Sequence, residues 1–110
     1  MLISKEETVV IFTRESAVFK DFSNKFFETY SNYKEDNLIL NLFSLDKLKI
    51  EELLEFLEVS NKHRNNKKSF VLVTDALHTD DIPESLVVVP TVQEAIDLIE
   101  MEEIERDLDF

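Results

Sequence analysis

Apolar residues occur in this chain in two patterns, short continuous runs and spacings of three and four residues. The alternation of these patterns predicts strands separated by helices. Four short runs rich in β-branched or aliphatic residues are typical of strands: residues 8–13 (TVVIFT), 38–43 (LILNLF), 70–74 (FVLVT) and 86–89 (LVVV). The run at 38–43 is apolar except at Asn41, as expected for a strand covered on both faces. Residues 2–3 are expected to pair with the first strand across the charged turn at residues 5–7.

A helix is predicted after the first strand, because aromatic residues recur there at steps of three and four. An aromatic stripe can line a ligand site, but at this spacing it more often faces the core. We therefore assign these residues to the core: Phe19, Phe22, Phe26, Tyr30 and Tyr33.

Residues 37–68 are predicted to form a buried strand, a polar turn and one long amphipathic helix. The helix would place its aliphatic residues toward the core, namely Ile50, Leu53, Leu54 and Leu57. The opposite side would carry its glutamates, namely Glu51, Glu52, Glu55 and Glu58.

Thr91 is followed three residues later by Glu94, a capping-box sequence that predicts the start of the last helix. Five apolar residues are expected to face inward from this helix: Val92, Ala95, Ile96, Ile99 and Ile104. We expect Leu108 and Phe110, in the acidic tail, to fold back onto the body.

Alternating strands and helices predict an α/β fold with a mixed sheet of four to five strands and helices packed on it. The sequence shows no internal repeat and no low-complexity linker. At 110 residues, the chain is expected to be one domain over residues 1–110, with an acidic C-terminal helix and tail at about residues 91–110.

Charge and composition exclude several function classes. The net charge of −12 disfavours binding to nucleic acid or to an anionic membrane. The high negative charge is expected to keep the protein soluble, or alternatively to form an acidic face that docks a basic partner. The chain has no cysteine, no run long enough to span a bilayer and no visible secretory signal, so a cytoplasmic protein is expected.

Glycine is absent from the chain, which excludes the glycine-rich phosphate loops of nucleotide-binding motifs. Two-residue hairpins are also expected to be disfavoured, since their turns require positive φ. Asn or Asp is expected to supply any left-handed turn residue.

No catalytic, cofactor-binding or metal-binding residue is predicted. His63 and His78 lack metal-ligand spacing, and no serine has the neighbouring glycines of a nucleophile elbow. Asp75, Asp80 and Asp81 are interpreted as solvated loop residues rather than as a cation site, because they lack the regular spacing of ligands in a calcium loop.

A basic cluster ends the second predicted helix: Lys62, His63, Arg64, Lys67 and Lys68. Cations at this end of a helix complement its dipole. Phosphate binding by the same cluster is the alternative.

Residues 41–53 (NLFSLDKLKIEEL) resemble the STAS domain, the fold of bacterial anti-sigma factor antagonists and of the cytoplasmic domain of sulfate transporters. In that family, a strand ending in a D/N-L-S type sequence leads to an Asp-Ser-Ser/Thr-Gly-Leu turn, which opens the central helix. The family's apolar spacing is matched here by Leu42, Leu45, Leu48 and Leu53. The later elements follow the same order, so the resemblance covers roughly residues 8–105.

The chain departs from the family at its regulatory turn. In regulatory members, the hydroxyl residue before the glycine is phosphorylated to release the partner, whereas residues 49–52 here read KIEE. The phosphorylation switch therefore does not carry over. Glu51 is interpreted as an ordinary first-turn glutamate, and alternatively as a permanent phosphate mimic. Ser44 is the nearest hydroxyl, but it lies in the wrong part of the turn.

The resemblance implies a non-enzymatic, regulatory, bacterial protein-interaction module that needs no cofactor. Its partner would be a protein, with a homodimer as an alternative partner arrangement. The candidate partner surface is Ser44, Asp46, Lys47, Lys49, Glu51, Glu52 and Glu55. The acidic C-terminal helix is an alternative surface.

Two other functions stay open. Some short STAS-like chains bear the name ribonuclease Z, so a small enzyme or an enzyme's accessory subunit is one alternative. The H-x-H-x-D-H metal site of that activity is missing from this sequence. A small-ligand sensor is the other alternative, although the absence of glycine loops argues against nucleotide binding.

Overall fold

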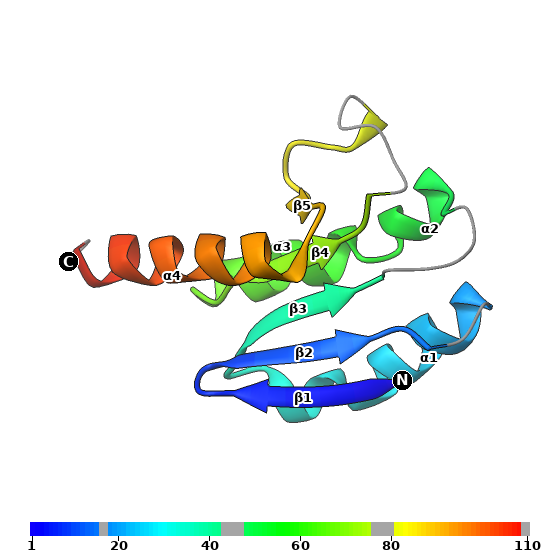
Figure 1. The fold of residues 1–110 in the computed structure, drawn as a ribbon, viewed down its shortest axis with the longest axis horizontal. Coiled ribbons are helices and arrows are strands. Elements are labelled where there is room, and N and C mark those ends of the chain that lie inside the picture. Colours follow the sequence, from blue (N-terminus) through cyan, green and yellow to red (C-terminus); the bar gives the residue numbers. More distant parts are fainter. Residues whose placement is uncertain (16–17, 43–47, 76–80, 109–110) are drawn as a thin grey trace.

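A five-stranded mixed sheet runs through the middle of the molecule (Figure 1). The computed structural model describes residues 1–15, 18–42, 48–75 and 81–108. The strands lie side by side in sequence order, and only the first pair is antiparallel. They are β1 (Leu2–Glu6), β2 (Val9–Thr13), β3 (Asn37–Asn41), β4 (Phe70–Val73) and β5 (Val88–Val89). This arrangement confirms the predicted α/β class and the expected pairing of residues 2–3 with the first strand.

Helices cover both faces of the sheet. The first face is covered by α1 (Phe19–Thr29), the 3-10 turn η1 (Tyr30–Tyr33) and α3 (Leu57–Asn65). The short helix α2 (Ile50–Leu54) lies between β3 and α3 in the chain. The second face is covered by α4 (Val92–Leu108), which in Figure 1 runs roughly along the direction of the strands toward the C-terminus. No helix in the described residues has the length and apolar character to cross a membrane.

The first face holds an aromatic core. Phe26 of α1 lies at its centre, with its ring centroid 5.1 Å from that of Phe12, 5.7 Å from Phe56 and 6.1 Å from Phe70. The three contacts are edge-to-face, a favourable geometry for aromatic rings. The predicted aromatic stripe is confirmed as core.

The second face holds a smaller aliphatic core. It consists of Ile39, Val71, Val73, Ala95 and Ile99, each at most 2% exposed. Ile104 is 59% exposed and Leu108 is 73% exposed, so the prediction that they face or fold onto the body was wrong. Together with Met101 they form an outer apolar stripe at i, i+3 and i+7, opposite the buried side of α4. Phe110 lies outside the described residues.

The single long helix predicted after β3 was also wrong, because it is divided into α2 and α3. At the division, the Phe56 N–H donates to the Leu53 carbonyl three residues back, at 3.0 Å. This tighter turn brings Phe56 fully into the aromatic core and leaves Leu54 39% exposed. Burial of the larger side chain thus overrides the regular helical period.

A two-residue hairpin joins β1 to β2, contrary to the prediction from the lack of glycine. Glu6 pairs with Val9, so Glu7 and Thr8 form the loop, and Glu7 has a φ of 55°. Lys67, after α3, has a φ of 63°. Among the described residues, left-handed backbone is therefore supplied by Glu and Lys rather than by Asn or Asp. Such a conformation costs roughly 1–2 kcal/mol in a residue with a Cβ atom.

Candidate functional site

The predicted partner surface centres on α2, and the described part of it lies on one short segment. Lys49 precedes the helix and Glu51 is exposed in its first turn. The carboxylate of Glu52 accepts a hydrogen bond from the Lys49 backbone N–H at 2.9 Å, so Glu52 caps the helix instead of facing a partner freely. Ser44, Asp46 and Lys47 lie outside the described residues.

Glu55 connects α2 to α1. Its carboxylate lies 2.7 Å from the Lys20 ammonium, and the two side chains are 31% and 65% exposed. An ion pair this exposed contributes at most about 1 kcal/mol, so its main effect is to orient the two side chains. Within the described residues, Glu51 forms no such ion pair. Its role as an ordinary first-turn glutamate or as a phosphate mimic stays a prediction.

Apolar side chains are exposed around the same helices. Leu54 of α2 is 39% exposed, Phe27 of α1 is 44% exposed and Val18 is 56% exposed. The Phe27 ring stacks on Phe56 with centroids 5.7 Å apart and an interplanar angle of 24°. Phe27 is therefore held against the core while part of its surface stays accessible.

His63 does not belong to the surface cluster in which the sequence placed it. Its side chain is fully buried, with Nε2 2.7 Å from the Asp36 carbonyl and Nδ1 2.8 Å from the Tyr30 hydroxyl. The carbonyl can only accept, so Nε2 carries the proton and Nδ1 accepts from Tyr30. Burial lowers the pKa of His63, and the nearby cations Lys68 and Arg64 also lower it. Tyr30 has a pKa raised by burial.

This pairing makes His63 a structural histidine rather than a metal ligand. Among the described residues, no group of three or more His, Asp or Glu side chains is arranged to hold a metal ion. Asp75 and Asp81 are exposed, whereas His78 and Asp80 lie outside the described residues.

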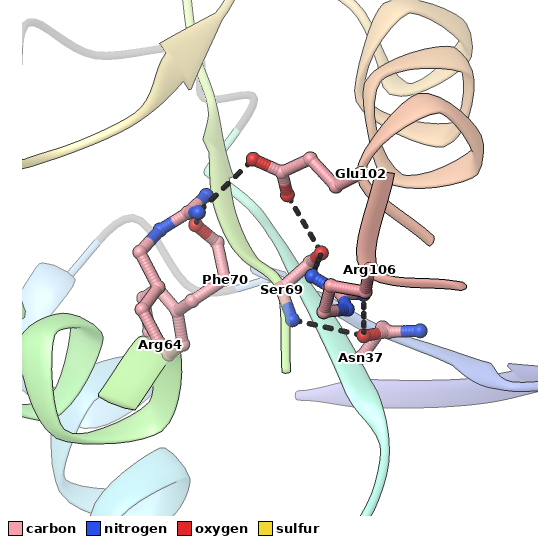
Figure 2. A network of polar contacts seen from close by, with 6 residues as sticks. All are labelled: Asn37, Arg64, Ser69, Phe70, Glu102 and Arg106. Atoms are coloured by element: carbon pink, nitrogen blue, oxygen red, sulfur yellow. Dashed lines mark hydrogen bonds and ion pairs between the residues drawn. The ribbon is translucent and has the colours of Figure 1, made fainter. Parts of the chain in front are cut away.

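A buried polar network joins α4 to the amino ends of β3 and β4 (Figure 2). Asn37 Oδ1 accepts from the Ser69 backbone N–H at 2.8 Å and from Arg106 Nη2 at 3.3 Å. Ser69 Oγ donates to Glu102 Oε1 at 2.6 Å and accepts from Arg106 Nη1 at 3.2 Å. Because Asn37 and Ser69 are at most 2% exposed, this network satisfies polar groups that water cannot reach.

Arg64 extends the network to α3. Its Nη1 donates to Glu102 Oε2 at 3.0 Å, and its Nη2 donates to the Phe70 carbonyl at 3.0 Å. On the other side of the network, Glu103 Oε1 accepts from Asn37 Nδ2 at 3.1 Å and from Thr8 Oγ1 at 3.0 Å. The last turns of α4 are thus bonded to α3 and to three neighbouring strands or their ends.

Beside this network, four cationic side chains line a hollow of about 290 Å³. We call it the basic cup, and its residues are Arg64, Lys67, Lys68 and Arg106. Arg106 was missed by the sequence reasoning. A signal was present, since Arg106 is the only cation in α4 and falls on the buried stripe with Ala95, Ile99 and Glu102.

A second hollow, of about 390 Å³, lies at the carboxyl ends of β2, β3 and β4. Thr13, Arg14 and Asn41 line it together with residues 90–92 at the start of α4. Arg14 is 7% exposed, and its guanidinium carbon lies 5.4 Å from the centre of the Phe19 ring. The Thr91 hydroxyl accepts from the Glu94 N–H at 3.1 Å, which confirms the predicted cap. In sheets with parallel strands, ligands commonly bind at this edge.

The comparisons with known proteins bear on the fold. No family model matches the sequence, and no curated protein matches it. Among solved structures, the chain is similar to a serine-to-glutamate variant of RsbS from Moorella thermoacetica, with a TM-score of 0.60 over 90% of this chain and 96% of that one. RsbS is a STAS-domain anti-sigma factor antagonist. The fold is STAS-like. At 12% sequence identity, the likeness is one of fold.

Proposed function

We propose that this chain is a non-enzymatic, STAS-like regulatory module that binds a partner protein through the surface around α2. The observation that carries the proposal is the STAS-like fold, in which α2 follows the carboxyl end of β3 and exposes Leu54 beside Glu51. We further propose that residues 1–110 act as one domain.

The chemistry of the surface specifies the kind of partner. Leu54 and Phe27 offer partly exposed apolar carbon, which supplies affinity when a partner buries it. Glu51 adds an exposed negative charge to a chain whose net charge is −12. The complementary partner surface is an apolar patch bordered by Lys or Arg, because opposite charges speed association and exclude other partners.

Regulation at this surface would differ from the phosphorylation switch of STAS regulators. Residues 49–52 contain no hydroxyl, so no phosphate ester of the kind used by the STAS regulators can form at these positions. Glu52 is engaged in the cap, which leaves Glu51 as the constant negative charge of the first turn. We therefore propose constitutive binding, with the amount of complex set by the concentrations of the two proteins.

The experiment begins by cross-linking the wild-type chain to its partner in native cells and identifying the partner. The dissociation constant is then measured with both purified proteins. We expect Glu51→Lys with Leu54→Asp to weaken binding at least tenfold. The matched control is Glu105→Lys with Ile104→Asp, which makes the same chemical changes on exposed positions of α4. The control should bind as the wild type does. Loss of binding in the control alone would assign the partner to α4 and sink the proposal.

Small-ligand sensing is a second candidate, which the hollow at the carboxyl ends of the strands favours. A thermal-shift screen would detect it as a concentration-dependent stabilisation that is lost in Asn41→Leu. The control Asn24→Leu changes an exposed asparagine of α1 and should keep the effect. Stabilisation that survives in Asn41→Leu would count against this hollow.

For a nuclease role, we expect no RNA cleavage by the purified, zinc-supplemented chain. His63 is buried and already has partners on both ring nitrogens, so it offers no free metal ligand. Turnover that disappears in His63→Ala or His78→Ala would contradict this expectation.

A further inference from the structure

Positive charge is concentrated at one place on an acidic molecule. The chain has 12 Lys and Arg against 24 Asp and Glu, yet Arg64, Lys67, Lys68 and Arg106 line the same hollow of about 290 Å³. They come from the end of α3 and the last turns of α4, segments that only the fold brings together. A helix dipole explains cations at the end of α3. It does not explain why a cation from α4 faces the same space.

Most of this charge lacks a carboxylate partner within the described ranges. Among the described residues, Arg64 of the cup forms an ion pair, with Glu102 at 3.0 Å. Arg106 donates from Nη1 and Nη2 to the neutral oxygens of Ser69 and Asn37, and no ion pair of Arg106 occurs within the described ranges. Neither Lys67 nor Lys68 is ion-paired within the described residues. Three positive charges thus converge although acidic residues are twice as numerous in the chain.

The cup is held in place by buried structure. Arg106 is anchored by Asn37 and Ser69, and Figure 2 shows Arg64 and Arg106 on either side of Ser69. The backbone that carries the two lysines is fixed by the chain reversal after α3. There, the Lys67 N–H donates to the Arg64 carbonyl at 2.9 Å and Lys67 has a φ of 63°. A site whose groups are already in position loses little entropy when a ligand binds.

We propose that the basic cup binds an oxyanion of the phosphate class, either inorganic phosphate or the phosphate group of a small phosphate monoester. Each guanidinium has five N–H donors, and those not used on Glu102, Phe70, Ser69 or Asn37 can donate to phosphate oxygens, while the lysine ammonium groups add point charges. The hollow has room for a phosphate group, while the net charge of −12 repels an extended polyanion such as RNA.

This site is separate from the proposed partner surface. The cup lies at the amino ends of β3 and β4, marked by Asn37 and Ser69, whereas α2 follows the carboxyl end of β3. An anion in the cup would contact α3 and α4 together and strengthen the attachment of α4 to the rest of the fold. It would therefore act as a stabilising ligand of the second face of the sheet.

Calorimetric titration at constant ionic strength tests the site. The probes are inorganic phosphate and glycerol 3-phosphate. Sodium chloride is titrated as the control for nonspecific ionic effects. We expect saturable binding of one anion per chain to the wild type. Lys67→Ala with Lys68→Ala should weaken it at least tenfold, since two of the four cationic groups that line the cup are lost. Tighter binding of glycerol 3-phosphate would identify the ester as the source, and equal or tighter binding of phosphate would identify the free ion.

The matched control is Lys25→Ala with Lys34→Ala, which removes two exposed lysines elsewhere and changes the net charge equally. It should bind the anion as the wild type does, and circular dichroism should show all three proteins folded. The proposal is overturned if the wild type gives no saturable heat, or if both double variants lose affinity to the same extent.

Discussion

The two faces of the sheet are stabilised by different interactions. Under α1 and α3, interlocking aromatic rings such as Phe26 and Phe56 fill the space. Under α4, the core is a small set of aliphatic side chains, and the helix is additionally held by the network around Asn37. The first face therefore depends on packing, and the second depends on a few directional hydrogen bonds at one end of one helix.

This difference predicts which part of the molecule unfolds locally first. Packing of large rings is distributed over many contacts and is lost only when the whole core opens. A network centred on one buried amide can be broken by a single substitution. We expect α4 to open locally at a lower free energy than α1 or α3.

The largest effect is expected on the aromatic face. Phe56→Ala removes a fully buried ring and should lower the free energy of unfolding by about 3–5 kcal/mol, measured by urea denaturation. The control Phe27→Ala removes a ring that is 44% exposed and should cost less than half as much. Equal losses would show that the rings do not act as one core.

The next effect is expected on the second face. Asn37→Ala removes the oxygen that accepts from the Ser69 N–H and from Arg106 Nη2, so stability should fall by about 1–3 kcal/mol. Hydrogen exchange should accelerate in α4 more than in α1. The exposed control Asn24→Ala should leave both rates unchanged. If hydrogen exchange in Asn37→Ala accelerates equally in all helices, the proposed difference between the two faces is wrong.

A smaller effect is expected at the start of α4. Thr91→Ala removes the hydroxyl that accepts the Glu94 N–H and should destabilise the chain by about 1 kcal/mol, as thermal denaturation would show. Thr91→Ser keeps this acceptor and serves as the control. By contrast, α1 (Phe19–Thr29) is preceded by Val18, whose side chain cannot cap a helix, and its aromatic side chains pack into the core. If Thr91→Ala causes no loss of stability, the cap at the start of α4 does not contribute to the stability of the chain.

The smallest effect concerns pH and belongs to the aromatic face. Burial lowers the pKa of folded His63 below its ordinary value of 6.5, so the unfolded chain takes up the proton first as pH falls. His63 therefore contributes full stability above pH 6.5 and loses it progressively below that value. Urea denaturation at a series of pH values should show this loss in the wild type. His63→Gln, which cannot titrate, should lack that part of the pH dependence.

Parts of the fold governed by local pattern could be predicted from the sequence. The aromatic stripe of α1, the alternation of strands and helices along the chain and the Thr91 cap depend on residues close in the chain. The break before α3 could not be predicted, because Phe56 is drawn into a core built from distant segments. Ile104 was misplaced because α4 carries apolar residues on two sides, and periodicity alone does not say which side meets the sheet.

The candidate sites were less predictable than the fold. Glu51 and Glu55 could be placed near α2 from sequence order, yet the capping role of Glu52 and the Lys20 partner of Glu55 required coordinates. The local basic cluster at the end of α3 could be read from the sequence, but its meeting with Arg106 of α4 in the basic cup required coordinates. Sites of this kind are completed only by tertiary structure.

The outer stripe of α4 has a practical consequence for handling the protein. Met101, Ile104 and Leu108 expose apolar surface, and near neutral pH the charge of −12 keeps molecules apart despite it. The isoelectric point near 4.5 marks where that repulsion disappears. Solubility should therefore be lowest near this pH, and concentrated salt should favour clustering by screening the same charge. Dilute buffers near pH 8 are the conditions in which single chains are best studied.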